Sequence, residues 1–177
     1  MYNPIKFRQR LYVKKRVAVA FTGPSGSGKT SLVEKISKVL IQSKKVAIIK
    51  NDPKDKAHFD VKGKDSYTFT QTGAEVVVTS PTRTTYFSQR EKTLDSLVKM
   101  IDDFDILLVE GLKTLDLPRI AIFRNSIDES YFSFSEAIAI DESINVNDYT
   151  IPKQITILDL NNTSEIIAWI DTHAKTI

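Results

Sequence analysis

The ten residues from Thr22 to Ser31, TGPSGSGKTS, could hold the phosphates of a nucleotide. They contain the complete pattern Gly-x-x-x-x-Gly-Lys-Thr of a Walker A loop. Glycines let the backbone turn its N–H groups toward phosphate oxygens, and the start of a following helix adds positive potential. We expect Lys29 to neutralise the outer phosphates and the Thr30 hydroxyl to bind Mg²⁺. The predicted nucleotide-contacting residues of this loop are Gly23, Ser25, Gly26, Ser27, Gly28, Lys29, Thr30 and Ser31.

A second residue that could hold the metal stands in the segment DILLVEG, residues 105–111. Its apolar run ends in Glu110, and a carboxylate at the carboxyl end of a parallel strand faces the edge of the sheet where ligands bind. Glu110 is therefore predicted to bind Mg²⁺ and, with Lys29, to take part in any catalysis. Asp105 begins the same strand and is expected at the opposite edge of the sheet.

The polar segment KNDPKDKAHFDVKGKDS, residues 50–66, is the third candidate region. It follows a strand that we expect to neighbour the strand before the Walker A loop. Asp60 and Asp52 are its predicted Mg²⁺ ligands, and Asp60 is also a predicted catalytic residue, through the metal or through a water molecule. A lone histidine in a polar loop is more often a bystander, so His58 receives no role.

These residues need a framework of alternating strands and helices. Short apolar runs rich in β-branched residues predict buried strands, and apolar residues at helical spacing predict helices. The expected strands are 16–22, 46–49, 105–109, 119–123, 137–140 and 155–158, the expected helices 29–44, 65–72, 91–103 and one from 163–164, and the expected hairpin 75–79 with 84–87. This pattern predicts an α/β P-loop NTPase fold, a doubly wound, mainly parallel sheet with an inserted β-hairpin and six or seven strands in all.

The composition of the chain indicates its domain organisation and excludes some classes of partner. A basic arm at residues 1–15 is predicted to precede a single nucleotide-binding domain, residues 16–177, with a β insertion at about 75–88. The arm has no interleaved aromatic residues of the kind that single-strand binders use, so a nucleic-acid partner is not expected. No apolar run is long enough to cross a membrane, and the absence of cysteine fits a reducing compartment. We therefore expect a cytoplasmic protein.

Three segments together resemble one family. They are GPSGSGKTSL at 23–32, GKDS at 63–66 with TGA at 72–74, and VEGLK…LPRIAIFR at 109–124. They are similar to the MobB family of molybdopterin-guanine dinucleotide biosynthesis adapter proteins, and the resemblance spans roughly residues 16–170. It implies a fold shared with dethiobiotin synthetase and the nickel-insertion GTPases.

The same resemblance implies a GTP-binding adapter that uses Mg²⁺ and is at most a weak GTPase. It also implies a homodimer to which the β insertion contributes. The implied partner is a MobA-type molybdenum cofactor guanylyltransferase, and molybdopterin itself is a possible ligand.

The chain departs from the usual sequence pattern of the family in two respects. Lys50-Asn51 stands where many relatives carry Lys-His, and the Asn-Lys-x-Asp guanine signature is absent. Asp141 ends a strand at the place where such GTPases recognise guanine, so it is the predicted base contact. Lys113, Arg119 and Arg124 could contact phosphates, molybdopterin or the partner.

The alternative function is a small-molecule P-loop kinase or an ATP-dependent ligase like dethiobiotin synthetase. A nickel-insertion GTPase is disfavoured because the chain has no histidine-rich or cysteine-containing metal motif.

Overall fold

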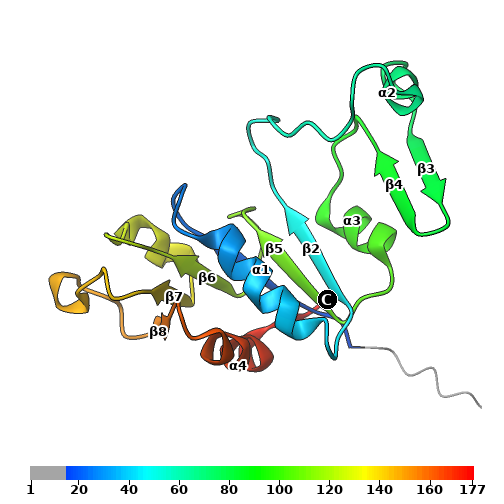
Figure 1. The fold of residues 1–177 in the computed structure, drawn as a ribbon. Helices are drawn as coiled ribbons and strands as arrows, with labels where there is room; N and C mark the ends of the chain where they lie inside the picture. Colours follow the sequence, from blue (N-terminus) through cyan, green and yellow to red (C-terminus); the bar gives the residue numbers. More distant parts are fainter. Residues whose placement is uncertain (1–14) are drawn as a thin grey trace, which may run out of the picture. The chain divides into compact units, whose positions relative to one another are not determined.

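The computed structural model describes residues 15–177, which form two compact units (Figure 1). The first unit contains residues 15–51 and 103–177, and the second contains residues 52–102. The β insertion predicted at about 75–88 lies inside this larger second unit. The predicted basic arm, apart from Lys15, lies outside the described residues.

The first unit is built on a sheet of seven strands. Six of them run parallel in the order β2-β5-β1-β6-β7-β8, and the short strand β9 pairs antiparallel with the start of β1. The strands are β1 (Val17–Thr22), β2 (Val46–Lys50), β5 (Ile106–Glu110), β6 (Arg119–Ile122), β7 (Ala137–Ile140), β8 (Thr156–Asp159) and β9 (Lys175–Thr176). The predicted doubly wound, mainly parallel P-loop fold is thus confirmed.

The position of β2 corrects one prediction. We expected β2 to neighbour β1, but β5 lies between them and pairs with both. Strand β2 is therefore at the edge of the sheet, and it is not buried along its whole length as expected. The parallel register places Lys50 at the end of β2 opposite Glu110 at the end of β5.

Helices α1 (Lys29–Leu40) and α4 (Thr163–His173) share one hydrophobic core with the sheet (Figure 1). The apolar stripe of α1 supplies Leu32, Val33, Ile36 and Leu40, whereas Val39, which the helical spacing also placed in the stripe, is exposed. Side chains alternate between faces along a strand, so Val19 and Phe21 of β1 point into this core. Burying such a side chain contributes on the order of 2 kcal/mol each, which makes this face the main support of β1.

A second core cluster contains other residues of β6 and β7 together with the segments that follow these strands. The 3-10 helix η1 (Glu129–Phe134) contributes Tyr131, whose ring meets Phe123 edge to face at 5.5 Å between centroids. A second 3-10 helix, η2, spans Val146–Asp148. This cluster fixes the carboxyl ends of β6 and β7. The candidate site residues Arg124 and Asp141 come directly after its members Phe123 and Ile140.

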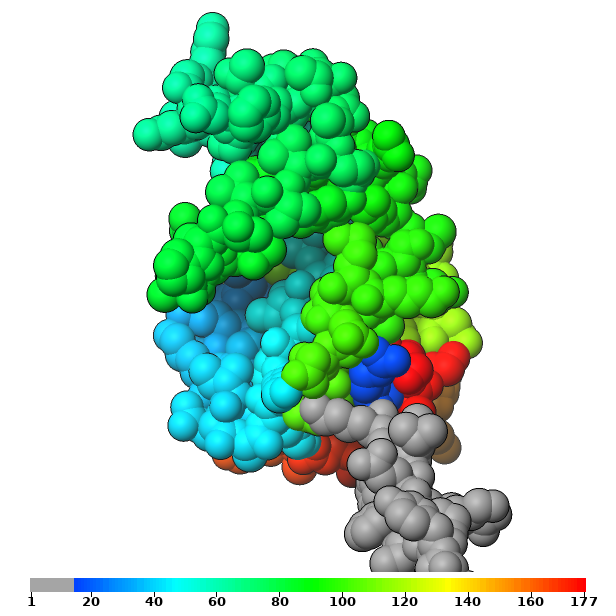
Figure 2. All heavy atoms as spheres, turned by 90° about the vertical axis from the view of Figure 1, so that its right-hand side faces the viewer, coloured from blue at the N-terminus to red at the C-terminus, as the bar shows by residue number. Residues whose placement is uncertain are grey.

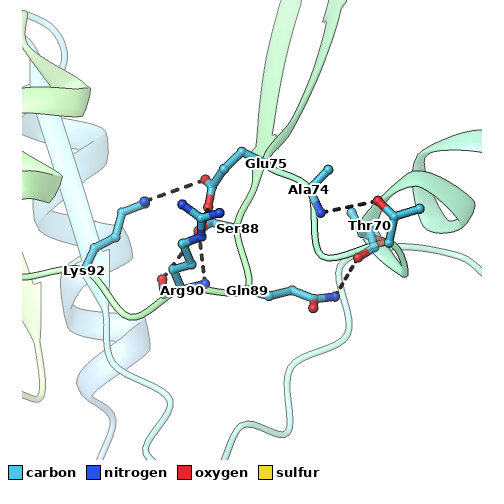
Figure 3. Close-up of polar contacts among 8 residues, drawn as sticks. Thr70, Ala74, Glu75, Ser88, Gln89, Arg90 and Lys92 are labelled. Carbon is cyan, nitrogen blue, oxygen red and sulfur yellow. Dashed lines mark hydrogen bonds and ion pairs between the residues drawn. The ribbon is translucent and has the colours of Figure 1, made fainter.

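The second unit contains α2 (Asp65–Thr70), the hairpin of β3 (Val76–Ser80) and β4 (Arg83–Phe87), and α3 (Leu94–Ile101). Its atoms, teal to green in Figure 2, include several large apolar side chains that are exposed. A polar clamp closes the base of the hairpin: the Glu75 carboxylate accepts a hydrogen bond from Ser88 at 2.9 Å and pairs with Arg90 and Lys92 (Figure 3).

Several element boundaries differ from the predictions for local reasons. Helix α1 ends at Leu40, not at residue 44, because residues 42–44 are polar and the chain turns there to begin β2. Helix α3 is shorter than 91–103, since the Thr93 side chain caps it through the Ser96 N–H and Asp102 leaves the helical conformation with a positive φ of 57°. Helix α2 begins at Asp65, as predicted, and ends at Thr70 instead of residue 72. The described chain has nine strands, more than the six or seven predicted.

The clamp on Glu75 leads to a stability prediction. Glu75→Ala removes one hydrogen bond and two partly exposed ion pairs, and we expect the hairpin to lose about 1 kcal/mol of local stability. Hydrogen exchange of the β3 and β4 amides should then accelerate roughly fivefold. Glu91→Ala, at an exposed position, is the control, and equal exchange in the two variants would contradict the prediction.

Candidate phosphate-binding site

The predicted Walker A loop connects the carboxyl end of β1 to the first turn of α1. Gly28 precedes the helix in a left-handed conformation (φ 97°) and offers no side-chain cap to its N–H groups. No acidic residue stands in the first turn of α1. The free N–H groups and the helix dipole therefore leave positive potential at this point, as an anion site requires.

Gly23 is required by a close backbone contact. A Cβ at this position would lie 2.4 Å from the carbonyl oxygen of Ile122 in β6, and its φ of 140° disfavours other residues. Ser27 beside it is buried, and its hydroxyl has no hydrogen-bond partner within residues 15–177. A buried hydroxyl without a partner in the cradle fits a ligand that supplies one.

Lys29 folds back onto its own loop. Its ammonium group donates to the carbonyl oxygens of Gly23 at 3.0 Å and Pro24 at 2.6 Å. Burial lowers the pKa of Lys29 below its usual value, and the Glu110 carboxylate partly opposes this shift. The nearby cations Lys50 and Lys113 lower the pKa further. Here the ammonium group has only carbonyl oxygens as hydrogen-bond acceptors. A bound phosphate would give it an anionic partner.

Thr30 and Glu110 come together as predicted. The Thr30 hydroxyl, in the first turn of α1, donates at 3.2 Å to Oε2 of Glu110, which ends the strand paired with β1. Lys50 Nζ lies 2.9 Å from the other oxygen, Glu110 Oε1. We did not predict this contact, because it depends on the pairing of β2 with β5. Asp105 lies at the opposite end of β5, as expected, and accepts a hydrogen bond from the Lys45 N–H.

Arg124 stands on the other side of the loop, just after β6. A Cβ on Gly28 would lie 3.3 Å from Arg124 Nε. Arg124 Nη1 is 3.5 Å from Asp141 Oδ2, which follows β7. Hydrogen bonds from Ser143 to the Asp141 carboxylate hold the pKa of Asp141 below its usual value, and Arg124 adds to this effect. Arg124 and Asp141 are thus neighbours beside the phosphate loop.

The two other basic residues considered for ligand contact have structural partners. Arg119 is 3% exposed and donates to the carbonyl oxygens of Leu112, Leu115 and Phe134. It thereby holds the turn after β5 rather than pointing to solvent. The ammonium group of Lys113 lies 3.9 Å from the centre of the Tyr131 ring.

Asp52 and Asp60 belong to the second unit, and their contacts there are local. Asp52 Oδ2 accepts from the backbone N–H groups of Lys56 and Ala57. Asp60 Oδ1 accepts from the Ser66 hydroxyl at 2.9 Å, while its Oδ2 is buried without a partner in residues 15–177. Their metal-binding role stays a prediction. Over the same residues, no group of three or more histidine, cysteine, aspartate or glutamate side chains is placed to hold a metal ion.

A pocket of about 360 Å³ lies at the carboxyl ends of β7 and β8. Its polar lining consists of Asp141, Glu142, Asp159 and Asn161. The same edge of the sheet therefore carries Lys50, Glu110, Arg124, Asp141 and this pocket, and it is the edge where parallel α/β folds bind ligands.

A parallel sheet with a Walker A loop after β1, and an acid ending the adjacent strand, defines the P-loop NTPase class of α/β proteins. The family model of MobB, molybdopterin guanine dinucleotide synthesis protein B, matches residues 18–142. The chain belongs to this MobB family, in agreement with the resemblance seen in its motifs.

Individual relatives agree with this assignment. The molybdopterin-guanine dinucleotide biosynthesis adapter protein of Haemophilus influenzae is 29% identical over 159 residues, which are 86% of each chain. A relative from Methanocaldococcus jannaschii is 28% identical over 137 residues; the match covers 73% of this chain but only 57% of that relative. The crystal structure of Bacillus subtilis MobB has a TM-score of 0.70 at 21% identity and covers 89% of this chain and 98% of that one, which shows a shared fold.

Within residues 15–177, none of the helices combines the length and the apolar character needed to cross a membrane.

The close contact at Gly23 leads to a stability prediction. Gly26 also has a positive φ, but nothing lies within 4 Å of the Cβ that an alanine would add there. We expect Gly26→Ala to cost about 1–2 kcal/mol through its backbone conformation alone. Gly23→Ala should cost a further ~1–3 kcal/mol, because its methyl group would overlap the Ile122 carbonyl. Denaturant unfolding measures both variants, and equal losses would contradict the proposed packing.

Proposed function

We propose that this protein is a Mg²⁺·GTP-binding adapter in the biosynthesis of molybdopterin guanine dinucleotide. The observation that carries the proposal is the convergence of Lys29, Thr30 and Glu110 at an uncapped helix start. Membership of the MobB family supports the pathway and the adapter role. The nucleotide would supply phosphates to this cradle, and the pathway uses a guanine nucleotide.

The Mg²⁺ ligands are proposed to be Thr30 and Glu110 together with phosphate oxygens and water. Mg²⁺ usually takes only one or two carboxylates from a protein, so a larger acidic cluster is not needed. Lys50 now occupies one oxygen of Glu110 and holds the carboxylate in place. Asp60, with its unpartnered carboxylate oxygen, and Asp52 remain proposed as additional ligands.

The nucleoside is proposed to extend from the loop toward the pocket lined by Asp141, Glu142, Asp159 and Asn161. Neighbouring strands lie about 4.8 Å apart, so β7 and β8 are roughly 10 and 14 Å from β1. This matches the distance between the phosphates and the base of an extended nucleotide. The Glu142 and Asp159 carboxylates and the Asn161 side-chain oxygen also suit the N–H groups on the Watson–Crick edge of guanine.

The hairpin of the second unit supports the proposed homodimer. Strands β3 and β4 pair only with each other among the described strands, which leaves both outer edges open. Val77 and Val78 are 56% and 43% exposed on β3. An isolated two-stranded sheet is marginal in water, and open apolar edges favour pairing with another chain. The partner enzyme is proposed to be a MobA-type guanylyltransferase, with molybdopterin as a further possible ligand.

Hydrolysis of GTP is proposed to be weak at most. Neighbouring residues already engage Lys50, Lys113 and Arg119, so these cations do not extend toward an acceptor substrate. The alternative, a small-molecule kinase or an ATP-dependent ligase, would bind ATP and turn it over rapidly when its small acceptor is present.

A substitution in the cradle tests nucleotide binding. We expect Lys29→Ala to weaken Mg²⁺·GTP binding roughly ten- to a hundredfold, because a charge-assisted contact contributes about 1.5–3 kcal/mol and the cradle loses its main cation. Titration calorimetry measures the affinity, and thermal melting checks the fold. Unchanged GTP affinity in a folded Lys29→Ala protein would refute the placement of the phosphates.

A second substitution tests the metal. Glu110→Gln keeps the shape of the side chain but removes its charge, so we expect the Mg²⁺ concentration needed for half-maximal GTP binding to rise about tenfold. Glu136 is not suited as a control, because its carboxylate accepts a hydrogen bond from the Arg119 N–H. Exposed Glu129→Gln is the matched control, and an equal Mg²⁺ requirement in both variants would exclude Glu110 as a ligand.

A further inference from the structure

Positive charge accumulates where α1 begins. The Arg124 guanidinium packs on Gly28, the residue before the helix, at 3.3 Å from the position of a Cβ. Lys29 is the first residue of the helix, and the first turn contains no acid. Two cations beside the positive end of a helix dipole repel one another. An anion bound at this point would relieve that repulsion.

The Arg124 side chain is only partly used by its partner. Asp141 is 3.5 Å from one terminal nitrogen, and its carboxylate is 8% exposed, whereas the Arg124 side chain is 43% exposed. A guanidinium group has five N–H donors in a planar fork. The fork can therefore keep its contact with Asp141 and still present donors to a phosphate.

Asp141 is itself held in place. Its Oδ1 accepts hydrogen bonds from the hydroxyl and the backbone N–H of Ser143. The same Ser143 hydroxyl accepts a hydrogen bond from the Asn125 N–H at 2.8 Å. Asn125 adopts a positive φ of 64° in the turn directly after Arg124. One connected set of contacts thus fixes both the backbone turn and the side chain of Arg124.

We infer that Arg124 binds a phosphate of the nucleotide in the Walker A loop, and that Asp141 positions its guanidinium group instead of contacting the base. Since it needs a nucleotide in that loop, this inference rests on the proposed function. Arg124 stands on the β6 side of the loop, and Glu110 stands on the β5 side. The two residues therefore approach the phosphates from opposite sides, one with the metal and one with a planar fork that matches phosphate oxygens.

The two roles of Asp141 predict different behaviour. In the positioning role, both oxygens of its carboxylate are engaged within the protein, by Ser143 and Arg124. In the base-contact role, the carboxylate would accept the N–H groups of guanine. Xanthine carries a carbonyl oxygen in place of the guanine amino group, so an asparagine at this position would favour xanthine only in the second role.

The experiment measures binding of Mg²⁺·GTP and Mg²⁺·XTP to the full chain by titration calorimetry. We expect Arg124→Ala to weaken GTP binding roughly ten- to a hundredfold, and Arg124→Lys to recover part of this loss. Asp141→Asn should weaken GTP and XTP binding equally, about three- to tenfold. In the Arg124→Ala background, Asp141→Asn should cause no further loss, since it acts through Arg124. Lys153→Ala, an exposed residue of the same charge, is the control, and thermal melting checks every variant.

Any one of three results would overturn the inference alone. They are wild-type affinity for GTP in folded Arg124→Ala, a switch of preference from GTP to XTP in Asp141→Asn, and a further loss of affinity on adding Asp141→Asn to Arg124→Ala. A wild-type chain that binds no Mg²⁺·GTP would overturn the proposed function, and the inference with it. The failure of the two ideas is therefore distinguishable in one set of titrations.

Discussion

Unbalanced positive charge at the start of α1 is the constraint on which the candidate site depends. The helix begins without a cap or an acidic first turn, and Lys29 satisfies its ammonium group with carbonyl oxygens of its own loop. Such an arrangement is costly in isolation, because the helix dipole and the ammonium group have the same sign. The large apolar core beneath β1 and α1 offsets this cost, so the fold can keep an anion site ready.

The order of the strands determines which groups can reach that charge. Strand β5 places Glu110 beside Thr30, and β2 places Lys50 on the far side of Glu110. On the other flank, β6 leads to Arg124 and β7 leads to Asp141. The carboxyl edge of the sheet therefore carries a row of charges in which each acid lies next to a cation. A row of this kind holds side chains in place while leaving the loop between them positive.

Much of this arrangement could be predicted from the residues. The Walker A pattern and the apolar run before Glu110 were sufficient for the fold class and for the contact between Thr30 and Glu110, since both depend on local spacing and on the general geometry of parallel sheets. The contact of Lys50 with Glu110 could not be predicted, because pairing between strands distant in the chain leaves no local pattern. The burial of Arg119 was missed for a similar reason: the three carbonyl oxygens that it binds come from turns that only the folded chain assembles. The metal roles of Asp52 and Asp60 remain predictions.

The division of the chain into units also has a kinetic consequence. Strand β1 is made early, but both of its parallel neighbours, β5 and β6, come after the whole of residues 52–102. During synthesis the Walker A loop therefore leaves the ribosome long before the β6 carbonyl against which Gly23 packs. The second unit is continuous in sequence and is complete before β5 has been made. Domains generally fold as units while the chain is made, so the nucleotide cradle is completed only after the second unit, although its motif precedes that unit in the sequence.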